Sequence, residues 1–338
     1  MSNLFKKAIM FTDLHLGLKG NSKQHNQDCL DFVDWAIKVG KERNCETCFF
    51  LGDWHNNRST INVATLHYSL AALEKLSRAF DKVYFLPGNH DTYYRDKRDI
   101  QSVSWAKNIP NIRIVDGFFN EGDVSIVPWL VGDEHKKVKK ISAKYMMGHF
   151  ELPHFYMNAM VRMPDSGELK NDDLKGVERV FSGHFHKRQT QNNITYIGNC
   201  FGHNYSDAGD DARGVAILDW DGEPEYISWP AAPTFRVFLL SDLLTDTEQK
   251  VRANMFARVN LDIDISYEEA GFIRESLLDQ YKMRELTLIP IKAKNEHAND
   301  AGGDINFESI DTIVTGQLAE VKSEFYDSKL LLEIWQNL

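Results

Sequence analysis

The sequence predicts an α/β (α+β) fold in which two packed β-sheets are flanked by helices. In the first 150 residues, short apolar runs alternate with longer amphipathic stretches, which is the strand–helix rhythm of an α/β domain. Beyond them the apolar runs follow one another more closely, as expected for a second sheet. A small strand–helix–strand unit and a C-terminal pair of helices complete the predicted architecture.

Three strands and two helices are predicted in the N-terminal part of the chain. The apolar runs at residues 8–12, 47–51 and 82–86 have the length of buried strands. Residues 24–43 and 60–80, which separate these runs, carry apolar side chains at helical spacing, so each helix should bury one face. Each strand ends in a polar motif, and the ends of parallel strands meet at one edge of a sheet.

The rest of the chain is predicted as a second group of strands followed by smaller modules. Short strands are expected at residues 112–115, 124–128, 145–147, 179–181, 195–197, 214–218 and 225–228. The polar segment 161–176 is predicted to be a surface loop. We expect a main domain over residues 1–235, a small domain over 236–292, a polar linker over 293–305 and a helical module over 306–338.

The small domain and the C-terminal helical module are predicted from local spacing of apolar residues. Residues 256–265, 267–280 and 285–290 are predicted as the strand, helix and strand of the small domain. Residues 307–338 return to helical spacing and carry two apolar stripes. Because short helices gain most of their stability by packing an apolar face, this module should bury its stripes against the chain's own core or against a partner.

Composition limits the partners that the chain can bind. The formal net charge of −10 argues against a nucleic-acid-binding protein with a broad basic surface. A nuclease is still allowed, because bound divalent metals add positive charge where a phosphate would lie. The four cysteines, with a lone CxxC pair, are expected to be buried, and they fit a reducing compartment. No signal peptide and no membrane span are expected.

Five short motifs, each directly after a predicted strand, carry the chemistry. They are Asp13-Leu14-His15, Gly52-Asp53, Gly88-Asn89-His90-Asp91, Gly148-His149-Phe150-Glu151 and Gly183-His184-Phe185-His186. Their carboxylates, imidazoles and amide suit Mn, Fe, Zn or Mg, and the lack of cysteine disfavours a structural zinc site. The neighbouring glycines let the backbone turn sharply and approach a bound ion closely.

Together these motifs resemble those of the calcineurin-like metallophosphoesterases over residues 8–220. The resemblance implies two divalent metal ions, with Mn(II) expected, and seven ligands: Asp13, His15, Asp53 and His186 for one ion, and Asp53, Asn89, His149 and His184 for the other. Asp53 would therefore bridge the ions. In this family the two ions clamp a phosphoryl group and activate a water for attack on phosphorus. His90 resembles the histidine that stabilises or protonates the leaving oxygen, and Asp91 is expected to orient it.

A narrower resemblance concerns residues 196–219, which are similar to the end of the nuclease domain in SbcD-type DNA repair nucleases, including their phage members. It implies a Mn-dependent double-stranded DNA exonuclease and single-stranded DNA endonuclease, the catalytic subunit of an ATPase–nuclease complex in recombination and double-strand-break repair. The small domain would cap the site and help to select DNA. Residues 306–338 would dock on an SMC-like coiled-coil ATPase of the SbcC type. A homodimer and a cytoplasmic location, in the host if a phage encodes the chain, are also implied.

One position departs from this nuclease pattern. Many members carry a histidine three residues after the bridging aspartate, where this chain has Asn56, whereas His55 lies two residues after it. We expect His55 and Asn56 either to contact substrate or to lie in an exposed loop. His154 and His203, close to the motifs, are weaker candidates for substrate contact. The remaining histidines (His25, His67, His135 and His297) and the lysine run over residues 136–140 are expected to face solvent.

Two other functions remain open. A two-metal phosphatase or phosphodiesterase acting on a protein or small-molecule phosphoester would use the same ligands. A scaffold with a vestigial site would not need to retain all seven of them and His90. The linker and helical pair favour the nuclease subunit, because a simple phosphatase has no need of a separate docking module.

Overall fold

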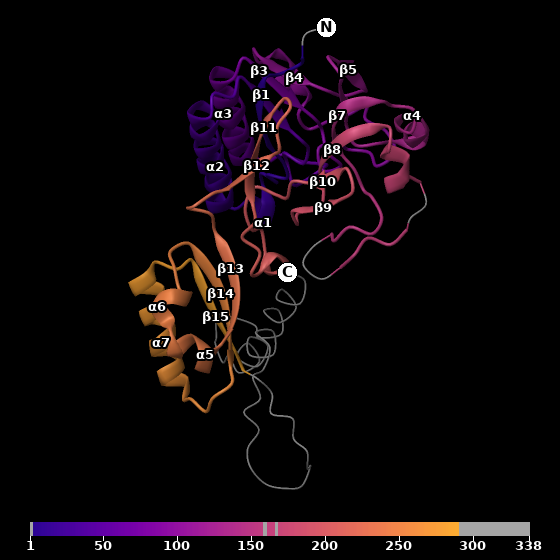
Figure 1. Cartoon of the computed structure of the whole chain (residues 1–338). Helices are drawn as coiled ribbons and strands as arrows, with labels where there is room; N and C mark the ends of the chain where they lie inside the picture. The colour runs from indigo at the N-terminus through magenta and orange to yellow at the C-terminus, as the bar shows by residue number, and fades with distance from the viewer. Residues whose placement is uncertain (1–2, 158–160, 166–167, 291–338) are drawn as a thin grey trace, which may run out of the picture. The chain divides into compact units, whose positions relative to one another are not determined.

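The computed structural model describes residues 3–157, 161–165 and 168–290 (Figure 1). Its first sheet has the strand order β12-β11-β1-β2-β3-β4. The strands are β1 (Lys7–Phe11), β2 (Thr47–Phe50), β3 (Lys82–Phe85), β4 (Ile112–Ile114), β11 (Gly214–Asp219) and β12 (Glu225–Ser228). The strands β1 to β4 are parallel, and the pairs β1–β11 and β11–β12 are antiparallel.

The second sheet has the strand order β5-β6-β7-β8-β10-β9. Its strands are β5 (Phe119–Glu121), β6 (Val124–Val127), β7 (Ala143–His149), β8 (Val177–Gly183), β9 (Gln189–Gln191) and β10 (Ile194–Tyr196). The four central strands are parallel, and each edge strand is antiparallel to its neighbour. The two sheets therefore each place several strand ends at one edge, where loops can carry functional side chains.

Alternating side chains of β1 show how the layers pack. Ile9 and Phe11 belong to the cluster that also contains Phe32 of α2 (Lys23–Glu42), so one face of the first sheet is covered by helices. Met10 belongs to the cluster that contains Tyr145 of the second sheet. Because successive side chains of a strand point to opposite faces, the first sheet is buried between helices and the second sheet. The predicted architecture of two sheets flanked by helices is confirmed.

Two helices cover the outer face of the first sheet (Figure 1). Each of them begins at a side-chain cap. Ser22 accepts a hydrogen bond from the backbone N–H of His25 (3.3 Å) at the start of α2. Asn62 accepts one from Ala64 (2.9 Å) at the start of α3 (Val63–Ala79). These caps satisfy N–H groups that the first turn leaves free. The remaining short helical segments of this part are α1 (Leu18–Asn21), η1 (Ser104–Asn108), η2 (Gly132–Glu134), α4 (His135–Val138), η3 (Asn171–Leu174) and η4 (Tyr205–Asp207).

A third, fully parallel sheet has the order β13-β14-β15. Its strands are β13 (Thr234–Leu239), β14 (Met255–Leu261) and β15 (Glu285–Pro290), joined by α5 (Leu240–Thr245), α6 (Thr247–Lys250) and α7 (Tyr267–Tyr281). The sequence predicts β14, α7 and β15 but not β13. Because β13 begins at Thr234, this sheet starts before the boundary that we placed after residue 235.

Two further sequence predictions concern the segment 161–176 and the C-terminal modules. The described residues of the segment 161–176 are mostly exposed, as expected for a surface loop, but Met163, Leu169 and Leu174 pack in the apolar cluster on the outer face of the second sheet. The linker over 293–305 and the helical module over 306–338 lie outside the described residues. In the part of the chain that the structure describes, no helix has the length and apolar character needed to cross a membrane.

Candidate metal centre

The five sequence motifs converge on one site at the strand ends of the two large sheets. Asp13, Asp53 and Asn89 follow β1, β2 and β3 of the first sheet, while His149 ends β7 and His184 follows β8 of the second. The site is therefore assembled by the packing of two sheets, and neither sheet alone supplies all of the donors.

One group of donors lies around His15. The Nε2 atom of His15 is 3.8 Å from Oδ1 of Asp13 and 3.7 Å from Oδ2 of Asp53. Oδ1 of Asp13 also lies 3.9 Å from Nε2 of His186. These four side chains are the ones expected to hold the first ion.

The other group lies around Asn89. Its Oδ1 atom is 3.0 Å from Nε2 of His149 and 3.0 Å from Nδ1 of His184. Nε2 of His149 also lies 3.4 Å from Oδ1 of Asp53. The two oxygens of Asp53 thus face different groups, which is the arrangement that a bridging carboxylate requires.

Five of the seven donors are buried, His184 and His186 are half-buried, and several donor atoms have no partner among the described residues. Among the described residues, Oδ1 of Asp13 and both ring nitrogens of His15 are buried without a hydrogen bond. Buried polar atoms are nearly always paired, so a cluster of unpaired donors fits a bound cation. Carboxylate oxygens, imidazole nitrogens and an amide oxygen are also a donor set that divalent metals use. The residues present therefore fit two metal ions.

Burial and neighbouring charge set the protonation of the donors. Burial lowers the pKa of His15 well below its usual value, which keeps its ring neutral and able to act as a ligand. For Asp53, burial opposes ionisation, but His149, His15 and His90 outweigh it and hold the pKa well below the usual range. His149 differs from His15: burial lowers its pKa, but the charges of Asp53 and Asp13 outweigh burial and raise the pKa to about 9, so this ring has to lose a proton to become a ligand.

Glycine is required at two positions beside the donors. A Cβ atom on Gly52 would lie 2.2 Å from Nδ1 of His149, and one on Gly88 would lie 2.2 Å from Oδ1 of Asp53. Gly52 also has φ +106, a conformation that other residues rarely adopt. The two glycines therefore let the donors of neighbouring loops approach one another.

Four of the seven proposed ligands have left-handed backbone conformations. The φ angles are 54° for Asp13, 52° for His15, 60° for Asp53 and 88° for His184. Such conformations are uncommon outside glycine and cluster at functional sites. Backbone hydrogen bonds hold them, for example from Asp13 to Gly52 (2.9 Å) and from His15 to Asp53 (3.1 Å).

His90 lies beside the ligands, but its orientation comes from a partner that we did not predict. Its backbone N–H donates to Oδ1 of Asp53 (2.9 Å), and its Nδ1 lies 2.7 Å from the carbonyl oxygen of Asn56. The carboxylate of Asp91 instead accepts backbone N–H groups of Trp54, His55 and Gly88, at 2.9–3.1 Å. The prediction that Asp91 orients the His90 ring is therefore wrong: Asp91 ties the loop after β3 to the loop after β2.

The prediction that His55 either contacts substrate or is exposed is also wrong. Its side chain is buried, with Nδ1 2.8 Å from the hydroxyl of Ser102 and Nε2 2.9 Å from that of Ser69. Both ring nitrogens are thus occupied within the core. Asn56 contributes through its backbone carbonyl, which faces His90, and its expected contact with substrate remains untested.

The other histidines differ in burial, and His135, expected to face solvent, is half-buried. His25, expected to face solvent, is buried, and its Nε2 lies 3.0 Å from the carbonyl oxygen of His15. His67 and His154 are exposed, and His297 lies outside the described residues. His203 is buried beside the ligands, where ring nitrogens of His15, His186 and His203 lie within 4.8 Å of one another. Its expected contact with substrate remains untested, and its place beside His15 and His186 was not predicted from the sequence.

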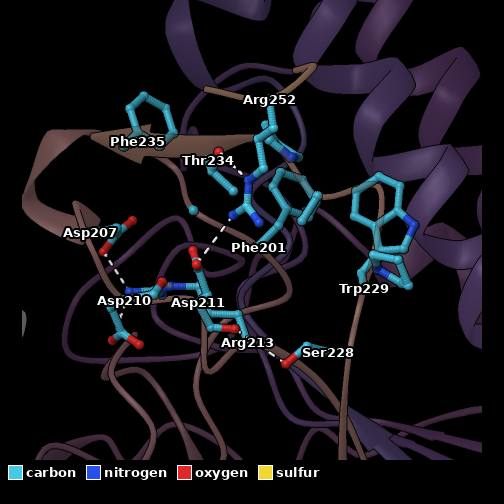
Figure 2. Close-up of a pocket in the computed structure, with 14 residues that line it drawn as sticks. Phe201, Asp207, Asp210, Asp211, Arg213, Ser228, Trp229, Thr234, Phe235 and Arg252 are labelled. Atoms are coloured by element: carbon cyan, nitrogen blue, oxygen red, sulfur yellow. Dashed lines mark hydrogen bonds and ion pairs between the residues drawn. The ribbon is translucent and has the colours of Figure 1, made fainter. Parts of the chain in front are cut away.

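Neither the charged segment over residues 136–140 nor a small cavity contains any of the seven proposed ligands. The four lysines of the segment are exposed, as expected, and Lys136 pairs with Asp133 (2.8 Å). The cavity, of about 160 Å³, is lined by side chains that include Phe201, Trp229 and Arg252 (Figure 2). None of the seven proposed ligands lines it, so this cavity is not the candidate metal centre.

Comparison with known proteins agrees with this geometry. The family model for calcineurin-like phosphoesterases matches residues 6–188, and the chain belongs to that family. Exonuclease subunit 1 of Enterobacteria phage T4 is 27% identical over 226 residues, which cover 64% of this chain and 66% of that protein. The chain thus aligns with just under two thirds of the length of this relative.

Two solved structures are also similar. The nuclease MPE of Pseudomonas putida is 17% identical with a TM-score of 0.31, and the match covers 62% of this chain and 82% of that one. A dimetal phosphatase from Danio rerio is 13% identical with a TM-score of 0.41, and the match covers 68% of this chain and all of that one.

Proposed function

We propose that this phosphoesterase is a metal-dependent DNA nuclease, with double-stranded exonuclease and single-stranded endonuclease activity. The observation that carries the proposal is the set of seven buried or half-buried donors arranged in two groups around Asp53. Such a pair of sites supports in-line displacement at a phosphoester. The choice of DNA is supported by the phage relative, which is named an exonuclease subunit.

The seven proposed ligands would form two metal sites that share Asp53. Asp13, His15 and His186 would hold one ion, and Asn89, His149 and His184 the other, with Asp53 shared. When bound, the ions, with Mn(II) proposed, would supply Lewis-acid activation of a water and of the phosphoryl group. The left-handed backbones at four of the ligands fix these donors before substrate arrives, so that little reorganisation is needed.

His90 would act on the leaving group. A carbonyl oxygen only accepts hydrogen bonds, so the contact with Asn56 places a proton on Nδ1 of His90 and directs the remaining nitrogen away from that loop. That nitrogen is then available to stabilise or protonate the departing oxygen. Asp91 would act indirectly, as a positioning residue that fixes the loops carrying His90 and Asp53.

The remaining parts of the proposal concern assembly. We propose that the third sheet belongs to a domain that caps the site and helps to select DNA. Residues 306–338 would dock on an SMC-like ATPase of the SbcC type, and the complex would act in recombination and double-strand-break repair. A homodimer is part of the same proposal. The relative's name, which calls it a subunit, supports a multi-chain enzyme.

The proposal is tested by assaying the full chain on linear duplex DNA, single-stranded DNA and a phosphomonoester. With Mn(II) we expect shortening of the duplex and internal cleavage of the single strand, and with a chelator we expect neither. Efficient hydrolysis of the monoester with no cleavage of either DNA would instead establish a phosphatase and overturn the nuclease proposal.

A further inference from the structure

We propose that His203 is an additional ligand of the ion held by Asp13, His15, Asp53 and His186. The inference rests on the proposed two-metal function and adds a fifth donor to one of the two groups. It would make the two positions chemically unequal.

The geometry of His203 suits a ligand. Its ring centroid lies 5.3 Å from that of His15 and 5.2 Å from that of His186, and ring nitrogens of the three residues lie within 4.8 Å of one another. The residue is 1% exposed, and within the described part of the chain its Nε2 atom has no hydrogen-bond partner. A buried imidazole nitrogen without a partner costs free energy, and a bound ion would supply the missing partner of this atom.

His25 is a neighbouring buried histidine whose Nε2 atom does have a partner in the protein. Its ring centroid lies 5.5 Å from that of His203, and it is also buried. Yet its Nε2 lies 3.0 Å from the carbonyl oxygen of His15, so the protein itself provides the partner. The fold therefore provides a partner for Nε2 of His25 and leaves Nε2 of His203 without one, beside His15 and His186.

A single arginine couples the loop that carries His203 to the ligand His186. The backbone N–H of His203 donates to Oδ2 of Asp207 (2.8 Å), and Oδ1 of Asp207 accepts from Nη2 of Arg213 (3.1 Å). Nη1 of the same arginine donates to the carbonyl oxygen of His186 (2.9 Å). Figure 2 shows Arg213 beside Asp207 and Asp210. This network fixes His203 relative to His186, as the outer partners of metal ligands commonly do.

The added imidazole would change the preference of its ion. That ion would meet three imidazoles and two carboxylates, whereas the other would meet two imidazoles, one amide and the shared carboxylate. Imidazole suits zinc and iron, whereas carboxylates and carbonyl oxygens suit magnesium and manganese. We therefore expect the position beside His203 to favour zinc more strongly than its neighbour does.

The test is calorimetric titration of the chelator-treated full chain with Zn(II) and with Mn(II). His203→Phe removes the donor and keeps most of the volume, and His203→Gln offers an oxygen donor in its place. His67→Phe, at an exposed position, controls for the loss of an imidazole. We expect His203→Phe to weaken zinc binding at one of the two positions by at least about 10-fold, since even outer partners of ligands are worth 10- to 100-fold. His203→Gln should recover more of the Mn(II) affinity than of the Zn(II) affinity.

A second measurement reports coordination directly. In the Co(II)-loaded protein, each bound imidazole that keeps an exchangeable N–H gives a paramagnetically shifted proton resonance, and His203→Phe should lose one of them. Zinc affinity and shifted resonances that are unchanged in a variant melting at the wild-type temperature would overturn the ligand role. Failure of the wild-type chain to bind two divalent ions would instead overturn the proposed function.

Discussion

Asp53 is the residue on which both ligand groups depend. Its two carboxylate oxygens face His149 and His15, at 3.4 and 3.7 Å. Its Oδ1 also accepts the backbone N–H of His90, so the same side chain connects the metal donors to the proposed leaving-group residue. Among the side chains present, only a carboxylate readily spans two cations.

The first prediction is that Asp53→Asn lowers metal occupancy. The amide keeps the size of the side chain but loses the negative charge that offsets two cations. We expect the bound Mn(II), measured by elemental analysis after dialysis, to fall well below the wild-type stoichiometry. Retention of both ions at wild-type affinity would show that Asp53 is not the bridge.

The second prediction is that His90→Gln separates chemistry from binding. His90 is not in the proposed ligand set, so Mn(II) affinity should stay close to that of the wild type. Turnover of DNA should fall by roughly 100-fold or more, as is typical for loss of a general acid. Single-turnover cleavage at saturating Mn(II) measures the effect, and a wild-type rate would refute the role.

For single residues, the sequence predicted which side chains converge but not their hydrogen-bond partners. The convergence of the seven proposed ligands could be predicted because their motifs follow strands, and strand ends meet. The partner of each side chain could not be predicted, because it depends on loop paths. Thus Asp91 accepts backbone N–H groups instead of orienting His90, and His55 is fixed by two serines that follow it by 14 and 47 residues.

At the scale of elements, the loops after the strands carry the strain of the site. The loop after β1 contains Asp13 and His15 in left-handed conformations, and the loop after β2 contains Gly52 and Asp53. Each such non-glycine residue costs on the order of 1–3 kcal/mol, which the surrounding hydrogen bonds and packing must offset. A rigid sandwich is a scaffold that can hold loops of this kind.

The third prediction is that Gly52→Ala damages both the fold and the site. The new methyl group would meet the His149 ring, and φ +106 is strained for alanine. We expect a loss of at least about 1–3 kcal/mol in the free energy of unfolding, together with weaker Mn(II) binding. Denaturant unfolding and calorimetry measure the two effects.

Gly20→Ala is the matched control for this prediction. Gly20 also has a positive φ (+65), but no neighbouring atom lies within 4 Å of the position of an added Cβ. This variant should therefore show the cost of backbone strain while metal affinity stays unchanged. Equal loss of metal affinity in both variants would contradict the steric explanation.

Regular elements were predictable where periodicity was strong. The long helices α2 and α3 begin and end within three residues of the predicted positions, because their apolar spacing and caps are encoded locally. β13 was missed, because only its first two residues are buried and its outer half lacks a clear alternation of apolar and polar side chains. The segment 161–176 is a largely exposed loop in its described residues, as predicted, but its polar composition does not predict that three apolar side chains anchor it.

At the scale of the whole molecule, the site exists only when the two large sheets pack. The first sheet supplies Asp13, Asp53 and Asn89, and the second supplies His149 and His184. The sequence predicted the fold class and the convergence of these side chains, but the distances between side chains from different sheets depend on how the two sheets pack. His203 is the clearest example, because its contact with His15 joins residues nearly 190 positions apart.

The fourth prediction is that the chain alone binds DNA weakly. A net charge of −10 leaves few cationic contacts for phosphates, so the two proposed ions would supply much of the attraction. We expect the affinity for duplex DNA, measured with Ca(II) in place of Mn(II), to fall steeply as salt is raised. Tight binding by the isolated chain at physiological salt would show that a basic surface exists elsewhere.

The last prediction concerns residues 306–338, which the sequence predicts as two short amphipathic helices after a polar linker. Helices of this length are marginal on their own and need a surface on which to bury their apolar stripes. A linker lets such a pair leave the catalytic body, so a partner is the favoured surface, and we propose an SMC-like ATPase. Deletion of these residues should leave Mn(II) binding and cleavage of simple DNA ends unchanged. The same deletion should abolish co-purification with the ATPase and any stimulation by ATP.

Two outcomes of this deletion would contradict the docking role. If the truncated chain loses its cooperative thermal transition or its Mn(II) binding, the helices pack on the chain's own core. If the truncated chain still co-purifies with the ATPase, another surface makes the contact. A full-length variant with Leu331 and Ile334 changed to serine keeps the length of the chain and removes part of one apolar stripe, so it separates loss of a docking face from loss of the segment itself. Loss of the complex in both variants, with a wild-type melting temperature, is the result that docking requires.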